Sequence, residues 1–171
     1  MLEIEPDRVG GDCPVPVRAT LISLEDRRAT SAGPTFLGYQ KTRYSLDLLY
    51  SARPLAELVR SALEKSFLRC ASGATASTPA LHIEVVLDTL VVFQEANPYP
   101  VKTGSRIDLS TRVLDAGNKE ALDSFVVHVK NESIAEAGTQ PDPKLVVEGL
   151  LDEATRKMMW QLVPAIRRRG G

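Results

Sequence analysis

The strongest constraint on the fold is an alternation of apolar and polar residues that recurs between residues 80 and 135. A period of two places one face of a β-strand on a core and leaves the other in solvent. The segment Asp115-Ala116-Gly117-Asn118 is a turn signal and predicts a hairpin between the last two runs. A change of phase near Thr89 and Leu90 predicts a bulge in the first run. We therefore expect three consecutive antiparallel strands, over residues 81–93, 106–114 and 123–134.

Two segments repeat apolar residues at the 3.6-residue spacing of amphipathic helices. The first starts at Pro54, where a missing N–H costs nothing in the first turn, and ends near Cys70. The second starts with Asp142-Pro143, a capping residue followed by a proline at the first helical position, and Pro164 ends or kinks it. Gly149 inside this helix predicts close backbone packing, because glycine costs about 1 kcal/mol of helix propensity.

An apolar strand over residues 17–24 precedes the first helix, which gives the element order β-α-β-β-β-α. We expect an α+β fold of two layers, a sandwich of one mixed sheet with both helices on one face. Strand 17–24 then runs parallel to strand 81–93, and a right-handed crossover through the first helix joins them. The expected organisation is a flexible leader over 1–16, a single domain over 17–166 and a disordered basic tail over 167–171.

Composition and motifs argue against several classes of function. The formal net charge of -1 gives no reason to expect a nucleic-acid partner, and no apolar run is long enough to span a bilayer. No GxSxG, HExxH, P-loop or GxGxxG motif occurs. His82 and His128 have no second ligand nearby in sequence, so we expect surface histidines and neither metal nor cofactor. We expect no enzymatic activity; the alternative is a hydrolase with a site assembled from distant loops.

Asp26-Arg27, directly after the first strand, is a more specific local feature. One interpretation is a turn with local side-chain hydrogen bonds. The other is a structural role, in which Arg27 pairs with a carboxylate and fixes the following loop as far as Gly38. The residues alone leave both interpretations open.

Three stretches of the chain resemble the YajG-like bacterial outer-membrane lipoproteins and related envelope lipoproteins. These are ISLEDRR at 22–28 with Leu37-Gly38 after it, PLAELVRSALEK at 54–65 and LHIEVVLDTL at 81–90. The resemblance covers most of residues 17–163 and implies the same order of strands and helices. The lipobox that such proteins carry before their anchoring cysteine is absent ahead of Cys13, and no secretory signal is present.

The resemblance implies a non-catalytic periplasmic domain, anchored at the outer membrane in the full-length protein by a lipid. Such a domain acts as an accessory or binding subunit and contacts an envelope protein or a glycolipid. The alternative is a cytoplasmic adaptor domain. The resemblance implies no catalytic residues.

The end of strand 81–93 and the loop after it are the expected contact region. Val91, Phe93, Pro98 and Tyr99 gather apolar and aromatic groups where a loop is usually polar, and such patches often mark binding sites. The alternative is that Phe93 and Tyr99 tuck under the end of the sheet.

Two further predictions concern structural residues. Trp160 lies between Met159 and Leu162 on the second helix, so we expect it to complete the core, at a cost of about 3–5 kcal/mol when replaced by Ala. Cys13 precedes the first strand and Cys70 closes the first helix. In a strand–helix–strand crossover these two points approach each other, so an oxidising periplasm would let the thiols pair. The alternative, which a cytoplasmic location would favour, is one buried thiol and one exposed thiol.

Overall fold

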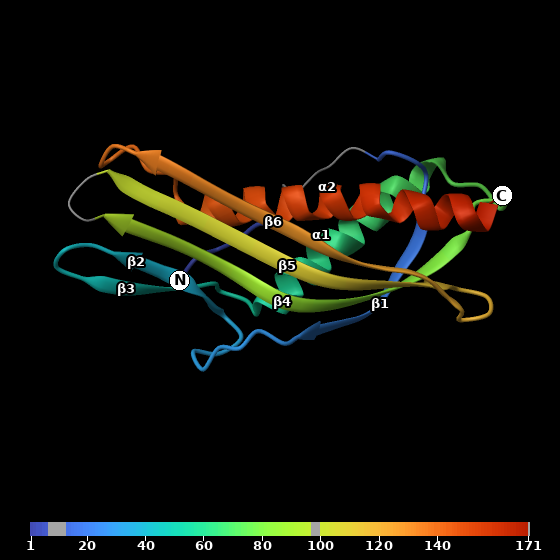
Figure 1. Cartoon of the computed structure of the whole chain (residues 1–171), viewed down its shortest axis with the longest axis horizontal. Helices are drawn as coiled ribbons and strands as arrows, with labels where there is room; N and C mark the ends of the chain where they lie inside the picture. Colours follow the sequence, from blue (N-terminus) through green and yellow to red (C-terminus); the bar gives the residue numbers. More distant parts are fainter. Residues whose placement is uncertain (7–12, 97–99, 171) are drawn as a thin grey trace.

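The computed structural model describes residues 1–6, 13–96 and 100–170. Within them lie a six-stranded sheet, two α-helices and a short 3-10 helix (Figure 1). The strands are β1 (Arg18–Asp26), β2 (Phe36–Lys41), β3 (Leu46–Tyr50), β4 (Ala80–Ala96), β5 (Val101–Asp115) and β6 (Ala121–Ala135). The helices are α1 (Leu55–Cys70), η2 (Ala71–Gly73) and α2 (Pro143–Gly170).

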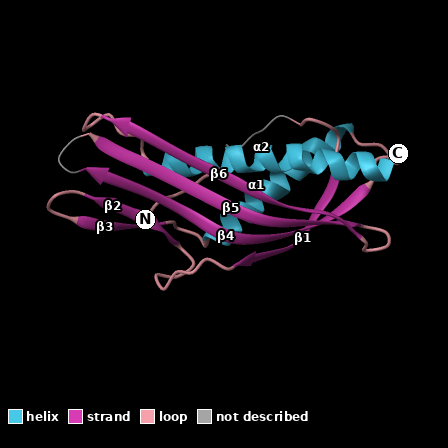
Figure 2. Cartoon of the chain, viewed as in Figure 1, coloured by secondary structure: helices cyan, strands magenta, loops and turns pink. Residues whose placement is uncertain are grey.

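Strand β4 is the centre of the sheet. The order is β3-β2-β4-β5-β6, and β1 also pairs with β4. Both β1 and β2 run parallel to β4 on the same side, β1 beside its first half and β2 beside its last residues. Strands β4, β5 and β6 form an antiparallel meander. The predicted α+β fold is confirmed, with one mixed sheet and both helices on one face (Figure 2).

The expected bulge in β4 is also present, as a register shift between Leu87 and Thr89. The β2–β3 hairpin is an addition to the predicted order, because residues 39–50 indicate at most a short strand before Leu48. All three meander strands extend beyond the ranges expected from their alternation, and they reach 17, 15 and 15 residues.

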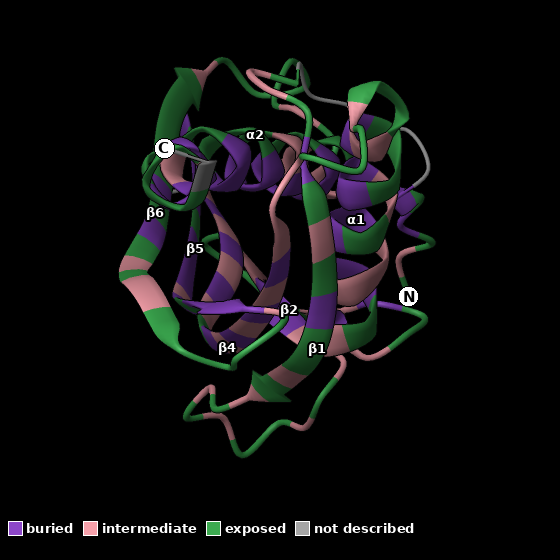
Figure 3. Cartoon of the chain, turned by 90° about the vertical axis from the view of Figure 1, so that its right-hand side faces the viewer, coloured by how far each residue is buried: buried purple, intermediate pink, exposed green. Residues whose placement is uncertain are grey.

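The core lies between the sheet and the two helices. Alternate residues of β4 are buried, and the apolar stripes of α1 and α2 pack against them. Figure 3 shows burial along the chain, with both helices on one side of the sheet. The buried helical residues include Leu55, Leu58, Leu63 and Phe67 in α1 and Leu150, Leu151, Met158 and Leu162 in α2. We call the other surface of the sheet, which no helix covers, the open face.

Residue Asp142 begins α2 as predicted. Its Oδ1 accepts a hydrogen bond from the Lys144 N–H at 2.9 Å, and its carbonyl accepts one from the Val146 N–H at 3.1 Å. Pro164, however, does not end the helix, which continues to Gly170. Pro164 is exposed, so water can bond the carbonyl that its missing N–H leaves without a partner.

The terminal segments are more ordered than the sequence predicted. Ile4 is buried, Leu2 pairs with Ser51, and the Glu5 N–H donates to Glu148 Oε1 at 3.0 Å. At the other end, Arg168 Nη1 donates to the Leu122 carbonyl at 3.0 Å, and Arg169 contacts the Asp115 carboxylate. Backbone and charged groups of the domain thus bind these residues, contacts that the expected flexible leader and disordered basic tail did not include.

The prediction that Trp160 completes the core is wrong. Its side chain is 57% exposed. Trp160 follows Glu153, Arg156 and Lys157 at intervals of three and four residues, so it shares the solvent-facing side of α2 with these charged residues. Met159 and Leu162, on either side of it in sequence, are the residues that turn toward the sheet.

Candidate binding surface

The corner after β1 is held by Arg28 and not by Arg27. Arg28 Nε and Nη2 donate to the two Asp26 carboxylate oxygens at 2.9 and 2.7 Å. The same guanidinium donates to the carbonyls of Phe36 at 2.8 Å and Pro34 at 3.0 Å. Arg28 therefore ties the end of β1 to the start of β2.

Arg27 points the other way, because neighbouring residues in an extended chain face opposite sides. It pairs with Glu25 at 2.8 Å, and both side chains are exposed. The structural role predicted for Arg27 belongs to its neighbour, while Asp26 has the role expected of it. The side-chain hydrogen bond from Arg28 holds the pKa of Asp26 below its usual value.

The two histidines lie on the open face, as predicted. His82 Nδ1 is 2.9 Å from Lys119 Nζ, and His128 Nδ1 contacts Asp108. Arg106 Nε donates to the other oxygen of Asp108 at 2.7 Å. Burial raises the pKa of Asp108, but the hydrogen bonds from His128 and Arg106 outweigh it and leave that pKa below its usual value. Among the described residues, no group of three or more His, Cys, Asp or Glu side chains could hold a metal ion.

An apolar patch covers one end of the open face. The register places Tyr39 beside both Phe93 of β4 and Leu48 of β3. The two aromatic rings stack, with centroids 5.9 Å apart and planes inclined by 19°. We define the open-face patch as Tyr39, Leu46, Leu48, Phe93 and Ile134. These residues lie on β2, β3, β4 and β6 at the same end of the sheet.

Gly104 of β5 has no side chain, and this leaves room for the ring of Phe93. Phe93 lies over Gly104, where a Cβ atom would come within 2.2 Å of its ring. Lys102 Nζ lies 5.9 Å from the same ring centroid, at the distance of a cation–π contact. Phe93 therefore lies flat across β5 and presents a half-buried aromatic surface.

The predicted contact residues are only partly described. Val91 and Phe93 are half-buried on the open face, whereas Pro98 and Tyr99 lie outside the described residues. Sequence reasoning missed Leu46, Leu48 and Ile134, which are 61%, 50% and 72% exposed. Leucine and isoleucine in strands are ordinary core residues, so only the side of the sheet on which they fall identifies them as surface groups.

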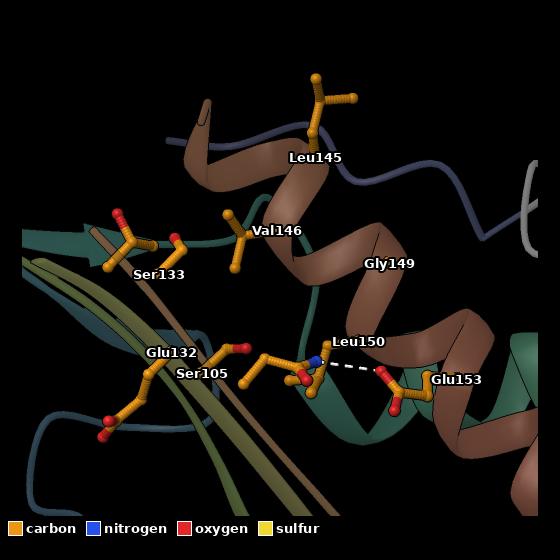
Figure 4. A pocket seen from close by; sticks show the side chains of 10 residues that line it. Ser105, Glu132, Ser133, Leu145, Val146, Gly149, Leu150 and Glu153 are labelled. Atoms are coloured by element: carbon orange, nitrogen blue, oxygen red, sulfur yellow. Dashed lines mark hydrogen bonds between the residues drawn. The ribbon is translucent and has the colours of Figure 1, made fainter. Parts of the chain in front are cut away.

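A groove of about 260 Å³ lies at the same end of the molecule, between α2 and the last residues of β6 (Figure 4). Its lining combines hydroxyl groups of the sheet (Thr103, Ser105 and Ser133) with Leu145, Val146 and Leu150 of α2. Asn131 Nδ2 donates to Glu153 Oε2 at 3.0 Å across one end of the groove.

Gly149 leaves this groove open. No atom lies within 4 Å of the position that a Cβ would occupy there, so the close backbone packing predicted for Gly149 is wrong. The hydroxyl of Thr103 also lines the groove, is buried, and has no hydrogen-bond partner among the described residues.

Cys13 and Cys70 form a disulfide, with Cα atoms 5.4 Å apart. The Val17 N–H also donates to the Cys70 carbonyl at 3.0 Å, which places the start of β1 beside the end of α1. This is the approach of strand start and helix end that the crossover predicts.

Comparisons with known proteins identify the fold and nothing finer. No family model and no curated protein matches the chain. Protein XCC0632 from Xanthomonas campestris, of the DUF330 family, is 13% identical, with 94% of each chain covered and a TM-score of 0.64. A "putative lipoprotein" from Caulobacter crescentus is 15% identical over 85% of this chain and 90% of its own, with a TM-score of 0.43. The chain therefore shares the fold of XCC0632, and the YajG-like resemblance stays a prediction.

No helix in the described part of the chain is both long enough and apolar enough to cross a membrane.

Proposed function

We propose that this chain is a non-catalytic accessory domain of the bacterial cell envelope, which binds an envelope protein or a glycolipid. The observation that carries the binding role is the gathering of exposed apolar side chains at one end of the molecule. Tyr44, Leu46, Leu48, Ile134 and Leu145 are all at least half exposed there. We call this end, formed by the β2–β3 hairpin, the last residues of β4 and β6 and the first turns of α2, the hairpin end (Figure 1).

Exposing apolar groups to water is unfavourable, so a partner that covers them lowers the free energy of the system. The open-face patch adds aromatic rings, a residue type enriched at binding hot spots, and a lysine beside them. These features suit a partner that presents apolar groups next to an acidic or phosphate group.

The disulfide supports the periplasmic part of the proposal, because cysteine pairs persist in oxidising compartments. Attachment to the outer membrane would come from a lipid on the full-length protein, as the resemblance implies. The non-catalytic part rests on the sequence, in which no catalytic motif occurs.

Site-specific photo-crosslinking in cells tests the proposal. A benzoylphenylalanine residue replaces Leu48 in the full-length protein, and the control carries it at Val126, which is 54% exposed on the open face near the opposite end of β6. We expect adducts in the envelope fraction from position 48 at several times the yield from position 126.

Equal yields at both positions, or none at position 48, would contradict binding at the hairpin end. Adducts that form only with cytosolic proteins would favour the cytoplasmic adaptor. The mass of the adduct separates a protein partner from a glycolipid.

A further inference from the structure

Strand β6 is an edge of the sheet, and side chains of α2 bind part of that edge. Lys157 Nζ donates to the His128 carbonyl at 2.6 Å, and Arg168 Nη1 donates to the Leu122 carbonyl. These carbonyls point away from β5, toward the outside of the sheet. Long basic side chains from α2 therefore bind two outward carbonyls in the first part of β6, where an unprotected edge could otherwise pair with another strand.

The last part of the same edge is not covered. In an antiparallel strand the backbone groups of alternate residues point outward. The backbone groups of His128 point outward, so those of Lys130, Glu132 and Ile134 do as well. Apart from the β5–β6 pairing, no hydrogen bond to the backbone groups of these three residues occurs among the described residues, and their side chains are exposed.

The groove shown in Figure 4 lies beside this uncovered edge. Its wall is the apolar side of α2, formed by Leu145, Val146 and Leu150, and Gly149 keeps the space between helix and strand free. The buried hydroxyl of Thr103 at the floor has no hydrogen-bond partner in the described part of the chain. One polar group without a partner thus lies next to the outward backbone groups of β6.

The other edges of the sheet suit an added strand less well. The pairing of β1 with β4 contains a register shift between Leu21 and Ser23, and such a bulge interrupts a hydrogen-bond ladder. Strand β3 has five residues only. The register of β6 with β5 is continuous from Asp123 to Ala135.

From these observations we infer that an extended segment of a partner protein binds as an additional strand along residues 130–134 of β6. This inference deepens the proposed function, on which it rests, by naming the partner as a protein and its bound form as a β-strand. Backbone hydrogen bonds to Lys130, Glu132 and Ile134 supply the affinity, as in other cases of strand addition.

The two sides of the groove determine the sequence of the segment. Side chains that point toward α2 meet Leu145, Val146 and Leu150, so these positions are apolar. The intervening side chains lie beside Lys130 and Glu132, so those positions are polar or charged. The segment therefore alternates apolar and polar residues over about six positions.

Peptide selection on the intact, oxidised protein tests the inference. A display library of random ten-residue peptides is panned against the wild-type chain, and amide hydrogen exchange is measured by NMR with the enriched peptide. We expect an alternating peptide that slows exchange of the Lys130, Glu132 and Ile134 amides at least tenfold, while the Val126 amide is unchanged.

Two variants and one matched control separate strand addition from other modes of binding. Glu132→Pro removes one outward N–H without touching the bonds to β5, and Val126→Pro makes the same change between the two carbonyls that α2 binds, outside residues 130–134. Gly149→Met fills the groove, where a side chain meets no atom within 4 Å of its Cβ. We expect Glu132→Pro and Gly149→Met to weaken peptide binding at least tenfold and Val126→Pro to leave it unchanged.

The inference is overturned if no peptide is enriched, if the enriched peptide protects other amides, or if it binds the Glu132→Pro chain as tightly as the wild type. Crosslinking at position 48 would still support the proposed function in each of these cases, so the two failures are distinguishable. Loss of crosslinking with strand addition intact would overturn the role of the open-face patch instead.

Discussion

Arg27 and Arg28 are neighbours in sequence but bind different parts of the molecule. Arg28 is 5% exposed and joins Asp26 to two carbonyls at the start of β2, whereas Arg27 lies in solvent beside Glu25. Because a guanidinium offers five donors in a fixed plane, one arginine can satisfy a carboxylate and two carbonyls together. The corner therefore depends on one side chain of the pair.

Replacing each arginine in turn tests this difference. We expect Arg28→Ala to lower the free energy of unfolding by ~2 kcal/mol, because hydrogen bonds to a charged group in a part-buried site are lost. Arg27→Ala removes only an exposed ion pair, so it should change the free energy of unfolding by less than about 0.5 kcal/mol. Urea unfolding at pH 7 measures both, and equal effects would contradict the assignment.

The lowered pKa of Asp26 predicts how this difference depends on pH. A carboxyl whose pKa is lower in the folded chain stabilises it above the unfolded pKa, about 3.9, and loses that contribution as pH falls through the folded value. The difference in the free energy of unfolding between wild type and Arg28→Ala should therefore be smaller near pH 3 than at pH 7. A difference that grows in acid would contradict the sign.

At the level of whole elements, the meander and both helices were predictable because each repeats its pattern over many residues. The β2–β3 hairpin was not, since the register shift between Phe36 and Gly38 brings two neighbouring residues, Leu37 and Gly38, to the buried side and breaks the alternation. Gly38 itself has a φ of +155°, and a Cβ there would lie 1.7 Å from the Val92 carbonyl oxygen.

The candidate site was predictable to a smaller extent. Val91 and Phe93 were identified by their types and their place near a loop, but nothing local marks the open β6 edge, which arises from how far α2 reaches across the sheet. Trp160 illustrates the opposite case. Its spacing from Glu153, Arg156 and Lys157 was visible in the sequence, and the assumption that a large aromatic residue belongs to the core outweighed it.

Gly149 provides a prediction about helix α2. Gly149→Ala should raise the free energy of unfolding by about 1 kcal/mol, because alanine is the better helix former and its Cβ meets no atom within 4 Å. Gly104→Ala is the matched control with the opposite sign, since its Cβ would displace the ring of Phe93. Urea midpoints compare the two, and a destabilised Gly149→Ala chain would show that this face of α2 is packed.

For the molecule as a whole, the disulfide is a covalent link between the N-terminal segment and the domain. It spans a sequence separation of 57 residues. In the chain-entropy model, removing a cross-link of this span costs about 4 kcal/mol, because the unfolded chain regains the freedom of the loop.

The variant with Cys13→Ser and Cys70→Ser together should therefore be less stable than the oxidised wild type by about 4 kcal/mol. Wild-type chain treated with a reductant is the control and should unfold at the same urea concentration as the variant. Two free thiols in the freshly purified wild type, measured by mass after alkylation, would contradict the bond.

The parallel pairing of β1 with β4 also has a kinetic consequence. The meander joins strands that follow one another, whereas β1 must find β4 beyond the hairpin and the whole of α1. Contacts so distant along the chain slow folding, because a long loop must close before they contribute. Once Cys13 and Cys70 are joined, β1 begins five residues from one cysteine and β4 ten from the other. In the oxidised chain the loop that must close between β1 and β4 is therefore short, and this chain should refold faster than the reduced one.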